Sequence, residues 1–203
     1  MLMDVNEKEI VSQLEVDFPT AEQLENELKK TKNRSEFFRL LRSTLYSLIV
    51  VAAVAVLISV MFLPVLKVTG TSMTPTCHND DLIVCRKYAS FERGDVIAFY
   101  YNNRILLKRV IAVSGDTVNI EADGTVYINN ERLDEPYVNE LAFGECNIQM
   151  PYQVPDERIF VMGDHRATSI DSRSTKVGCI SEEAVVGKVF FRVAPFKRFG
   201  AVK

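Results

Sequence analysis

The organisation of this chain is decided by the stretch STLYSLIVVAAVAVLISVMFLPVL, which runs from Ser43 to Leu66. Its 24 residues carry no formal charge, whereas the 42 residues before it carry seven Lys or Arg and nine Asp or Glu. As an α-helix the stretch would be about 36 Å long, enough to cross a bilayer core of about 30 Å. Buried helices of soluble proteins are rarely so long and apolar on every face, and a cleaved secretory signal has a shorter apolar region behind a shorter leader. We therefore interpret residues 43–66 as an uncleaved transmembrane anchor.

The charges beside the anchor predict its orientation. Lys67 is the only cation close behind it, and six cations lie just before it: Lys29, Lys30, Lys32, Arg34, Arg39 and Arg42. Because the cytoplasmic flanks of membrane helices are enriched in Lys and Arg, we expect the N-terminus in the cytoplasm and the later residues on the outer face. The chain then divides into a cytoplasmic N-terminal segment (1–42), the anchor (43–66) and an extracytoplasmic domain (67–203).

The N-terminal segment carries a helix-start signal. Pro19 is followed by Thr20, a possible N-cap, and then by Glu22 and Gln23. This order is typical of the first turn of a helix. We expect a helix that runs from here toward the membrane.

Beyond the anchor, the hydrophobic pattern changes to short runs separated by turn residues. Runs of β-branched and aromatic residues predict strands at 95–101, 105–113, 117–121, 125–128, 158–162 and 184–193. Hairpin turns are predicted at Asn102-Asn103-Arg104 and Ala122-Asp123-Gly124, and a bulge at Gly187. The outer domain is therefore expected to be mostly β, and its length of about 135 residues is enough for a core of its own.

Charge and cysteine content limit the partners. The net charge is −3 and the second half contains no Lys/Arg-rich run, so we expect no nucleic-acid partner. The spacing of the four cysteines includes no CxxC pair, so no metal or other cofactor is expected. Disulfides can form on the outer face of a membrane, and Cys77 and Cys85 could face each other across a short hairpin. The sequence leaves the pairing of Cys77, Cys85, Cys146 and Cys179 open.

Two segments carry residues suited to nucleophilic catalysis. Ser72 lies in the loop Gly70–Thr76, and Lys108 and Arg109 interrupt the apolar strand 105–113. Strand alternation puts these two cations on opposite faces, so burial of either face buries a cation. A lysine buried among apolar neighbours has a lowered pKa, which lets its neutral amine act as a base. The alternatives are an ordinary loop serine and an edge strand whose cations reach water.

A third segment, MGDHRATSIDSR at residues 162–173, is dense in ionisable and turn-forming residues. Its Asp and Arg side chains could pair and hold the loop in one shape, although a solvated surface loop would have a similar composition. Four motifs occur in order after the anchor: SMTPT (72–76), RGDV (93–96), KRVIAVSGD (108–116) and GDHRATSIDSR (163–173). Together they resemble the signature blocks of bacterial type I signal peptidases, and the similarity covers roughly residues 60–195.

This resemblance implies a fold and a set of residue roles. The fold would be a mostly β extracytoplasmic catalytic domain of the signal-peptidase-like complex β type, with one N-terminal transmembrane α-helix and a helical cytoplasmic segment. Ser72 matches the nucleophile, Lys108 the general base, and Ser169 the serine that orients the lysine amine. The matched supporting charges are Asp171, Arg173, Arg109 and Asp164. The Ser72 N–H would form part of the oxyanion hole, and Gly70 stands where some relatives carry a second, hydroxyl donor.

The resemblance also implies a substrate and a location. The protein would be a membrane-bound, monomeric serine endopeptidase of the cytoplasmic membrane. It would remove signal peptides from exported preproteins through an acyl-enzyme, cutting after small residues in an Ala-x-Ala pattern. The extended substrate would add to strand edges near Val68–Thr71 and Leu106–Lys108, beside the lipid bilayer. Expected pocket residues are Val68, Met73, Ile83, Leu106 and Leu107.

Three other interpretations remain open. A Ser/His/Asp triad could use His165 or His78, but the position matching the base is Lys108. A cytoplasmic self-cleaving repressor could share the Ser/Lys pair, but such proteins are soluble. An inactive, membrane-anchored binding domain is opposed by the presence of both Ser72 and Lys108.

Overall fold

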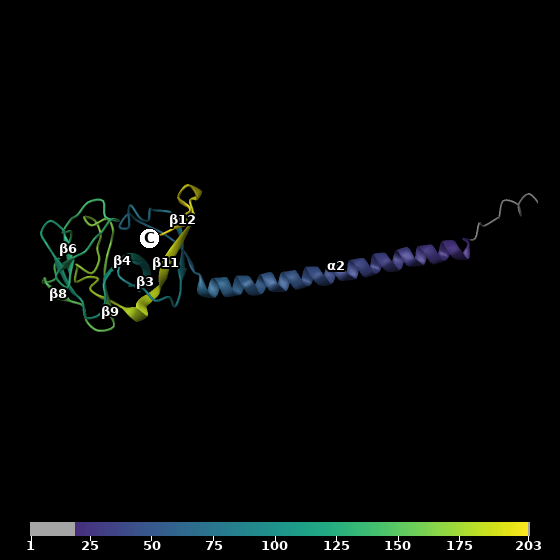
Figure 1. Ribbon diagram of the computed structural model, residues 1–203, viewed down its shortest axis with the longest axis horizontal. Coiled ribbons are helices and arrows are strands. Elements are labelled where there is room, and N and C mark those ends of the chain that lie inside the picture. Colours follow the sequence, from purple (N-terminus) through teal and green to yellow (C-terminus); the bar gives the residue numbers. More distant parts are fainter. Residues whose placement is uncertain (1–18, 203) are drawn as a thin grey trace, which may run out of the picture. The chain divides into compact units, whose positions relative to one another are not determined.

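The computed structural model describes residues 19–202, and the first part of the expected N-terminal segment lies outside this range. One continuous helix, α2 (Ala21–Phe62), extends through the rest of that segment and most of the expected anchor (Figure 1). Thr20 and Gln23 cap it reciprocally. The Gln23 N–H donates to Thr20 Oγ1 at 3.4 Å, and the Thr20 N–H donates to Gln23 Oε1 at 2.9 Å. The helix start predicted at Thr20 is confirmed.

The C-terminal end of α2 differs from the expected anchor boundary. The helix ends at Phe62, and strand β1 (Val65–Lys67) begins inside the range assigned to the anchor. The cause is Pro64, because the residue before a proline is disfavoured in the helical conformation. By length and composition, α2 can still cross a membrane, with a mean hydropathy of 2.7 in its most apolar window.

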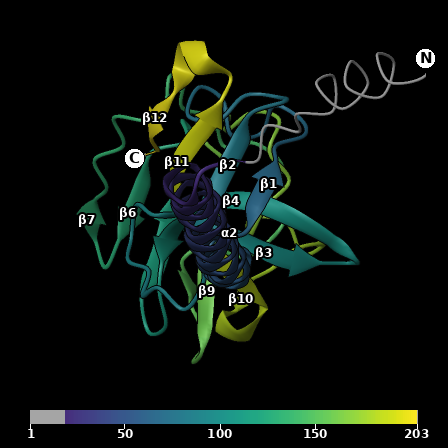
Figure 2. The same cartoon turned by 90° about the vertical axis from the view of Figure 1, so that its right-hand side faces the viewer.

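The part of the chain from Val56 onward forms a compact unit of its own. Its larger sheet is antiparallel and has the order β1-β2-β11-β3-β4-β9-β10, and β12 pairs with β11. Besides β1, its strands are β2 (Leu82–Arg86), β3 (Val96–Tyr101), β4 (Arg104–Ala112), β9 (Arg158–Met162), β10 (Ile180–Ser181), β11 (Val185–Ala194) and β12 (Gly200–Ala201). In Figure 2, β9 and β10 lie side by side at one end of this sheet. Two short 3₁₀ turns flank β11: η1 (Glu182–Ala184) and η2 (Phe196–Arg198).

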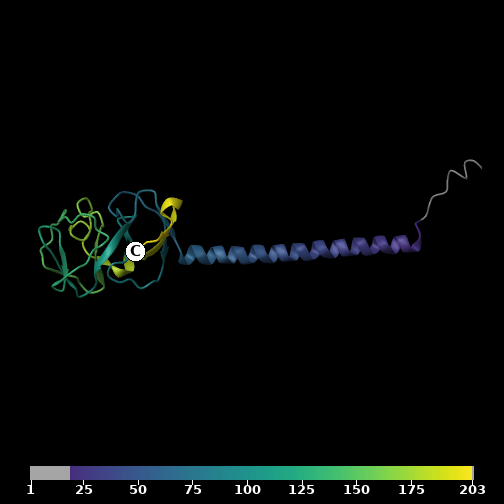
Figure 3. The same ribbon diagram turned by 45° about the horizontal axis from the view of Figure 1, so that its top comes forward.

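A second sheet of four strands has the order β7-β6-β5-β8. Its strands are β5 (Thr117–Ile120), β6 (Val126–Ile128), β7 (Glu131–Arg132) and β8 (Tyr152–Gln153). Figures 1 and 3 show its green strands at one end of the β domain. The predicted mostly β outer domain is therefore confirmed in its secondary structure.

The β3–β4 hairpin positions the catalytic candidates of β4, and its turn follows from two asparagines. Asn102 and Asn103 both have positive φ, of 43° and 62°. Two-residue hairpin loops of this twist need positive φ at both positions, which Asn tolerates better than most residues. The pairing register sets Ile97 opposite Lys108 and Val96 opposite Arg109. The turn that the sequence predicted therefore sets the position of both cations.

The loop that carries Ser72 is held by buried apolar residues. Met73 and Cys77 from the loop pack with Ile83 and Cys85 of β2 in one core cluster. All four cysteines are free thiols, so no disulfide braces the loop. Burial raises the pKa of Cys77 to about 11 and that of Cys85 to about 12, so both behave as small apolar core residues.

Candidate active site

Ser72 and Lys108, 36 residues apart in sequence, meet at the centre of the site. The Lys108 Nζ lies 2.7 Å from the Ser72 Oγ. Ser72 is half-buried in the loop after β1, and Lys108 projects from the middle of β4. This distance is the one expected between a nucleophile and the base that activates it.

Lys108 lies in an environment that favours its neutral form. Its side chain is only 4% exposed. Desolvation lowers the pKa of Lys108, and the carboxylates of Asp171 and Asp164 offset part of that effect. A neutral amine has a lone pair, so this lysine can accept a proton from Ser72.

Arg109, the next residue along β4, is also buried, with 1% exposure. Alternation predicts opposite faces for these two cations, and the structure buries both faces at this point of the strand. Arg109 makes a two-pronged ion pair with Asp164, with N–O distances of 2.8 and 2.7 Å. It also donates to the Gly94 carbonyl and to Thr76 Oγ1, at 2.6 and 3.1 Å. Arg109 thereby links β4 to the end of the Ser72 loop.

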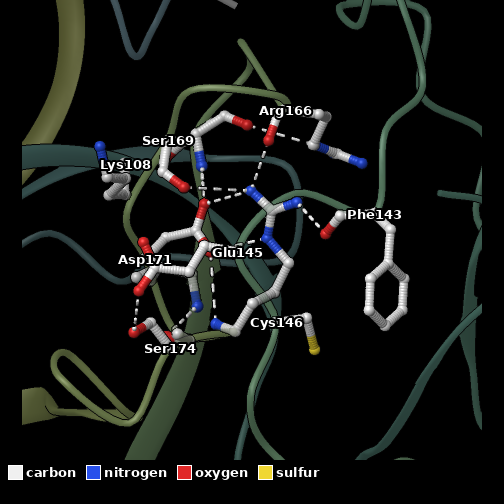
Figure 4. A network of polar contacts seen from close by, with 12 residues as sticks. Lys108, Phe143, Glu145, Cys146, Arg166, Ser169, Asp171 and Ser174 are labelled. Atoms are coloured by element: carbon white, nitrogen blue, oxygen red, sulfur yellow. Dashed lines mark hydrogen bonds and ion pairs between the residues drawn. The ribbon is translucent and has the colours of Figure 1, made fainter.

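Asp171 and Arg173 form a second ion pair beside the site, and both residues are fully buried. Figure 4 shows the network of polar contacts around Asp171. The Arg173 Nε and Nη2 lie 2.9 Å from the two Asp171 carboxylate oxygens. The second Asp171 oxygen also accepts the Gly163 N–H at 3.0 Å. Arg173 donates further to the carbonyls of Phe143 and Arg166, at 2.8 and 2.9 Å. This network fixes the turn that lies against Ser72.

Gly163 is the point where that turn meets the Ser72 loop. A Cβ at this position would lie 2.2 Å from Ser169 Oγ and 2.5 Å from the Ser72 carbonyl oxygen. The neighbouring His165 N–H donates to the same Ser72 carbonyl at 3.1 Å. Only a residue without a side chain lets the two segments approach this closely, so Gly163 permits the observed position of Ser72.

Ser169 lies in this cluster, but the expected contact with the lysine amine is not formed. Its hydroxyl is buried and has no hydrogen-bond partner among residues 19–202. A buried hydroxyl without a partner lowers the free energy of unfolding by about 1–3 kcal/mol, so its burial here destabilises the native state.

The structure shows contacts around the site that the sequence did not indicate. Arg166 is 1% exposed and makes a two-pronged ion pair with Glu135, which follows β7. Its Nε also donates to the Gly163 carbonyl at 3.2 Å. The ring of Tyr137 lies 3.8 Å from the Arg109 guanidinium carbon. Arg166 falls inside the GDHRATSIDSR motif, but its ion-pair partner Glu135 is 31 residues distant and no local pattern indicates that pairing.

A cleft of about 290 Å³ opens beside the Ser72–Lys108 pair. All five expected pocket residues line it: Val68, Met73, Ile83, Leu106 and Leu107. Gly70 also lines it, with a φ of +91° and its N–H bound to Asn79 Oδ1 at 2.9 Å. The lining is mostly apolar, apart from Ser72, Thr69 and two lysines.

The Ser72 N–H is available as a donor to a bound carbonyl. Among residues 19–202, no acceptor takes it. Gly70 has no side chain, so this position supplies no hydroxyl donor to the site.

The two histidines do not complete a triad with Ser72. His165 is exposed, and its Nδ1 lies 2.9 Å from Thr168 Oγ1. His78 Nδ1 is buried with no partner among the described residues. Metal-ligating side chains do not gather in groups of three or more anywhere in residues 19–202.

Comparison with known proteins places the chain in a family. The family model described as "Signal peptidase, peptidase S26" matches residues 41–194. The signal peptidase I of Bacillus amyloliquefaciens is 32% identical over 191 residues, covering 89% of this chain and all of that protein. The signal peptidase IB of Staphylococcus aureus (strain COL) is 36% identical over 152 residues, covering 65% of this chain and 78% of that protein.

Among solved structures, a signal peptidase I from Enterococcus faecalis V583 matches with a TM-score of 0.41 and 29% identity, covering 49% of this chain and 97% of that one. The family model spans more than half of this chain, and the Bacillus relative matches over its full length. This chain therefore belongs to the signal peptidase family, peptidase S26, whose members are serine endopeptidases that remove signal peptides.

Proposed function

We propose that this protein removes signal peptides from exported preproteins with Ser72 as nucleophile and Lys108 as the single general base and acid. The observation that carries the proposal is the 2.7 Å contact between Ser72 Oγ and the buried Lys108 Nζ. Ser72 Oγ attacks the scissile carbonyl carbon while its proton passes to the neutral Lys108 amine. Lys108 then gives that proton to the leaving nitrogen, and the carbon–nitrogen bond breaks. The signal peptide remains as an ester on Ser72.

Hydrolysis of the ester uses the same base. A water molecule attacks the ester carbonyl, Lys108 takes the water proton, and Ser72 regains its hydroxyl hydrogen. The Ser72 N–H stabilises the oxyanion in both halves of the reaction, and a single such donor is worth about 3–4 kcal/mol in other proteases. The buried Ser169 hydroxyl has no hydrogen-bond partner among residues 19–202. It orients the Lys108 amine after that amine has taken the proton from Ser72.

Two strand edges support an extended substrate in the cleft. In the large sheet, β1 pairs only with β2, so its outer edge has no partner strand among the described residues. β4 pairs with β9 only from Arg109 onward, so among the described strands β3 is the one partner of residues 104–108. The first edge lies earlier than the expected Val68–Thr71, because β1 ends at Lys67. Leu66 and Lys67 of β1 line the cleft together with Val68 and Thr69 just after the strand, and residues 105–108 of β4 line it as well. A peptide inserted between them would gain main-chain hydrogen bonds on both sides.

The apolar floor of the cleft supports a preference for small residues before the scissile bond. Met73 and Ile83 are 2% and 0% exposed, so the floor is packed and does not yield to a large side chain. We infer cleavage of the Ala-x-Ala type. The cationic residues before the anchor support an N-terminus in the cytoplasm, which sets this cleft on the outer face beside the bilayer.

Cleavage of a preprotein with a mapped cut site tests the proposal. The detergent-solubilised full chain should cut a preprotein with an Ala-x-Ala sequence after the second Ala, as shown by N-terminal sequencing of the product. Replacing that Ala with Leu should slow cleavage by at least about tenfold, because the larger side chain overfills the packed floor. Ser72→Ala, checked for unchanged thermal unfolding, should cut nothing. Cleavage by Ser72→Ala at the wild-type rate would overturn the proposal.

A further inference from the structure

A second cavity, of about 190 Å³, lies against the loop that carries Ser72. It shares no lining residue with the catalytic cleft. Thr74, two residues after Ser72, borders it, and so does His165, whose N–H holds the Ser72 carbonyl. The other lining residues are Asn139, Glu140, Asp164, Arg166 and Ala167.

The position of this cavity suggests a contact with the part of the substrate that follows the scissile bond, which is the start of the mature protein. The edges that would hold residues before the scissile bond are Leu66–Thr69 and Ile105–Lys108. A chain lying along these edges with its scissile carbonyl at Ser72 has its following residues beyond the edges. Thr74 is two residues after Ser72, the His165 N–H is bound to the Ser72 carbonyl, and both residues line the second cavity beside the nucleophile loop.

The charges around the cavity leave one carboxylate uncompensated. Asp164 is neutralised by Arg109, and Arg166 by Glu135. Glu140 is exposed, and among residues 19–202 no cation pairs with it. A cation entering the cavity therefore meets a net negative charge, and an anion meets repulsion.

We propose that this cavity is the subsite for the first residues of the mature protein, and that Glu140 makes it prefer a Lys or Arg side chain there over Asp or Glu. The proposal rests on the proposed function, since it assigns a binding site to the residues that follow the cut in the same preprotein. After cleavage the new amino terminus lies at Ser72, and the following side chains extend over Thr74 and His165.

The test uses the full chain and a set of peptides that are identical up to the scissile bond. Lys, Gln or Glu is placed at the first or the second position after the cut, and kcat/KM is measured for each. Since Glu140 is exposed, we expect Lys to exceed Glu by about three- to tenfold at one of these positions at low salt. Glu140→Gln should bring the Lys/Glu ratio close to one, and Glu140→Lys should invert it. The control Glu131→Gln, at an exposed glutamate in β7, should keep the wild-type ratio.

A steric variant gives a second readout. Ala167→Trp fills the cavity from its exposed rim and should slow peptides with a large residue after the cut more than peptides with Ala there. Equal rates for Lys, Gln and Glu peptides in the wild type would overturn the subsite and leave the cleavage function intact. An unchanged ratio in Glu140→Gln would overturn the role of Glu140. Absence of cleavage by the wild type, or cleavage by Ser72→Ala, would overturn both proposals.

Discussion

At the residue scale, the site depends on how tightly Lys108 is enclosed. A lysine in water is charged at neutral pH and cannot take a proton from serine. Here Lys108 is buried, and its amine lies 2.7 Å from the Ser72 hydroxyl oxygen. Desolvation lowers its pKa, while the negative charges of Asp171 and Asp164 keep that pKa from falling further. The Asp171–Arg173 and Asp164–Arg109 ion pairs therefore hold the loops in place and also affect the proton affinity of Lys108.

This balance predicts the pH dependence of cleavage. Because only neutral Lys108 accepts the Ser72 proton, kcat/KM should fall as the pH drops through the lowered pKa of Lys108. Asp171→Asn removes a negative charge that favours the protonated Lys108 amine. The fall of kcat/KM on the acid side of the pH profile, its acid limb, should therefore move to lower pH. The matched control Asp156→Asn, at an exposed carboxylate, should leave the limb in place. An acid limb that stays fixed or moves upward in Asp171→Asn would contradict the role given to Lys108.

At the scale of elements, a few buried charges join segments that the chain keeps far apart. Glu135 follows β7 and Arg166 lies in the turn after β9, and the contact between them is almost fully buried. Through the Gly163 carbonyl, Arg166 also supports the turn that presses on Ser72. The short loop after β7 thereby helps to hold the turn at Gly163 in place beside the candidate active site.

Breaking this contact should destabilise the fold. Glu135→Gln leaves the buried Arg166 charge without its counter-ion, and such a loss costs roughly 3–5 kcal/mol. Thermal unfolding should show a large drop in the midpoint. Glu145→Gln is the matched control, because Glu145 pairs with Lys176 at the surface, with exposures of 45% and 64%, and it should change the midpoint little. Equal midpoints for the two variants would show that the Glu135–Arg166 contact contributes no more than a surface pair.

The elements that the sequence predicted are those whose signal is local. The β3–β4 hairpin was predicted from Asn102-Asn103, strand β9 was predicted with its observed bounds, and the bulge at Gly187 coincides with a register shift between Val185 and Gly187. The strands β1, β2, β7, β8, β10 and β12 were not predicted, since most have only two or three residues and depend on distant partners.

The same distinction holds for the site. The motifs singled out the residues that meet at Ser72, because each motif is a short local pattern. They did not indicate the pairing of Arg166 with Glu135 or the stacking of Tyr137 on Arg109, which arise only when the chain folds back. Nor did they indicate that the Ser169 hydroxyl would have no partner within residues 19–202.

At the scale of the whole molecule, one long helix has the length and composition of a membrane span, and a compact β domain contains the candidate site. The helix is long and apolar enough to span a bilayer, and none of its residues is buried within the protein. The β domain has its own buried core and holds every residue of the candidate site. A peptidase bound to the membrane shares a surface with substrates whose signal segments enter the same bilayer, which raises the effective concentration of both.

The proposed orientation predicts the outcome of a topology experiment. The full chain should remain with membranes after alkaline carbonate extraction, because α2 is long and apolar enough to be buried in lipid. In intact cells stripped of their wall, external protease should digest residues 67–203 and spare an N-terminal epitope tag. Digestion of the tag with protection of the β domain would reverse the orientation, and release by carbonate would exclude a spanning helix.

The most direct measurement of the central claim compares preprotein cleavage by the wild type, Lys108→Ala and His165→Ala, each verified by thermal unfolding. If Lys108 is the base, Lys108→Ala should lose activity by about 1,000-fold or more, because losing one member of such a catalytic unit costs nearly as much as losing all of it. His165→Ala should keep most of its activity, since its backbone N–H, and not its ring, contacts Ser72. A folded Lys108→Ala that still cleaves near the wild-type rate, with His165→Ala inactive, would contradict the Ser72–Lys108 assignment and make His165 the base.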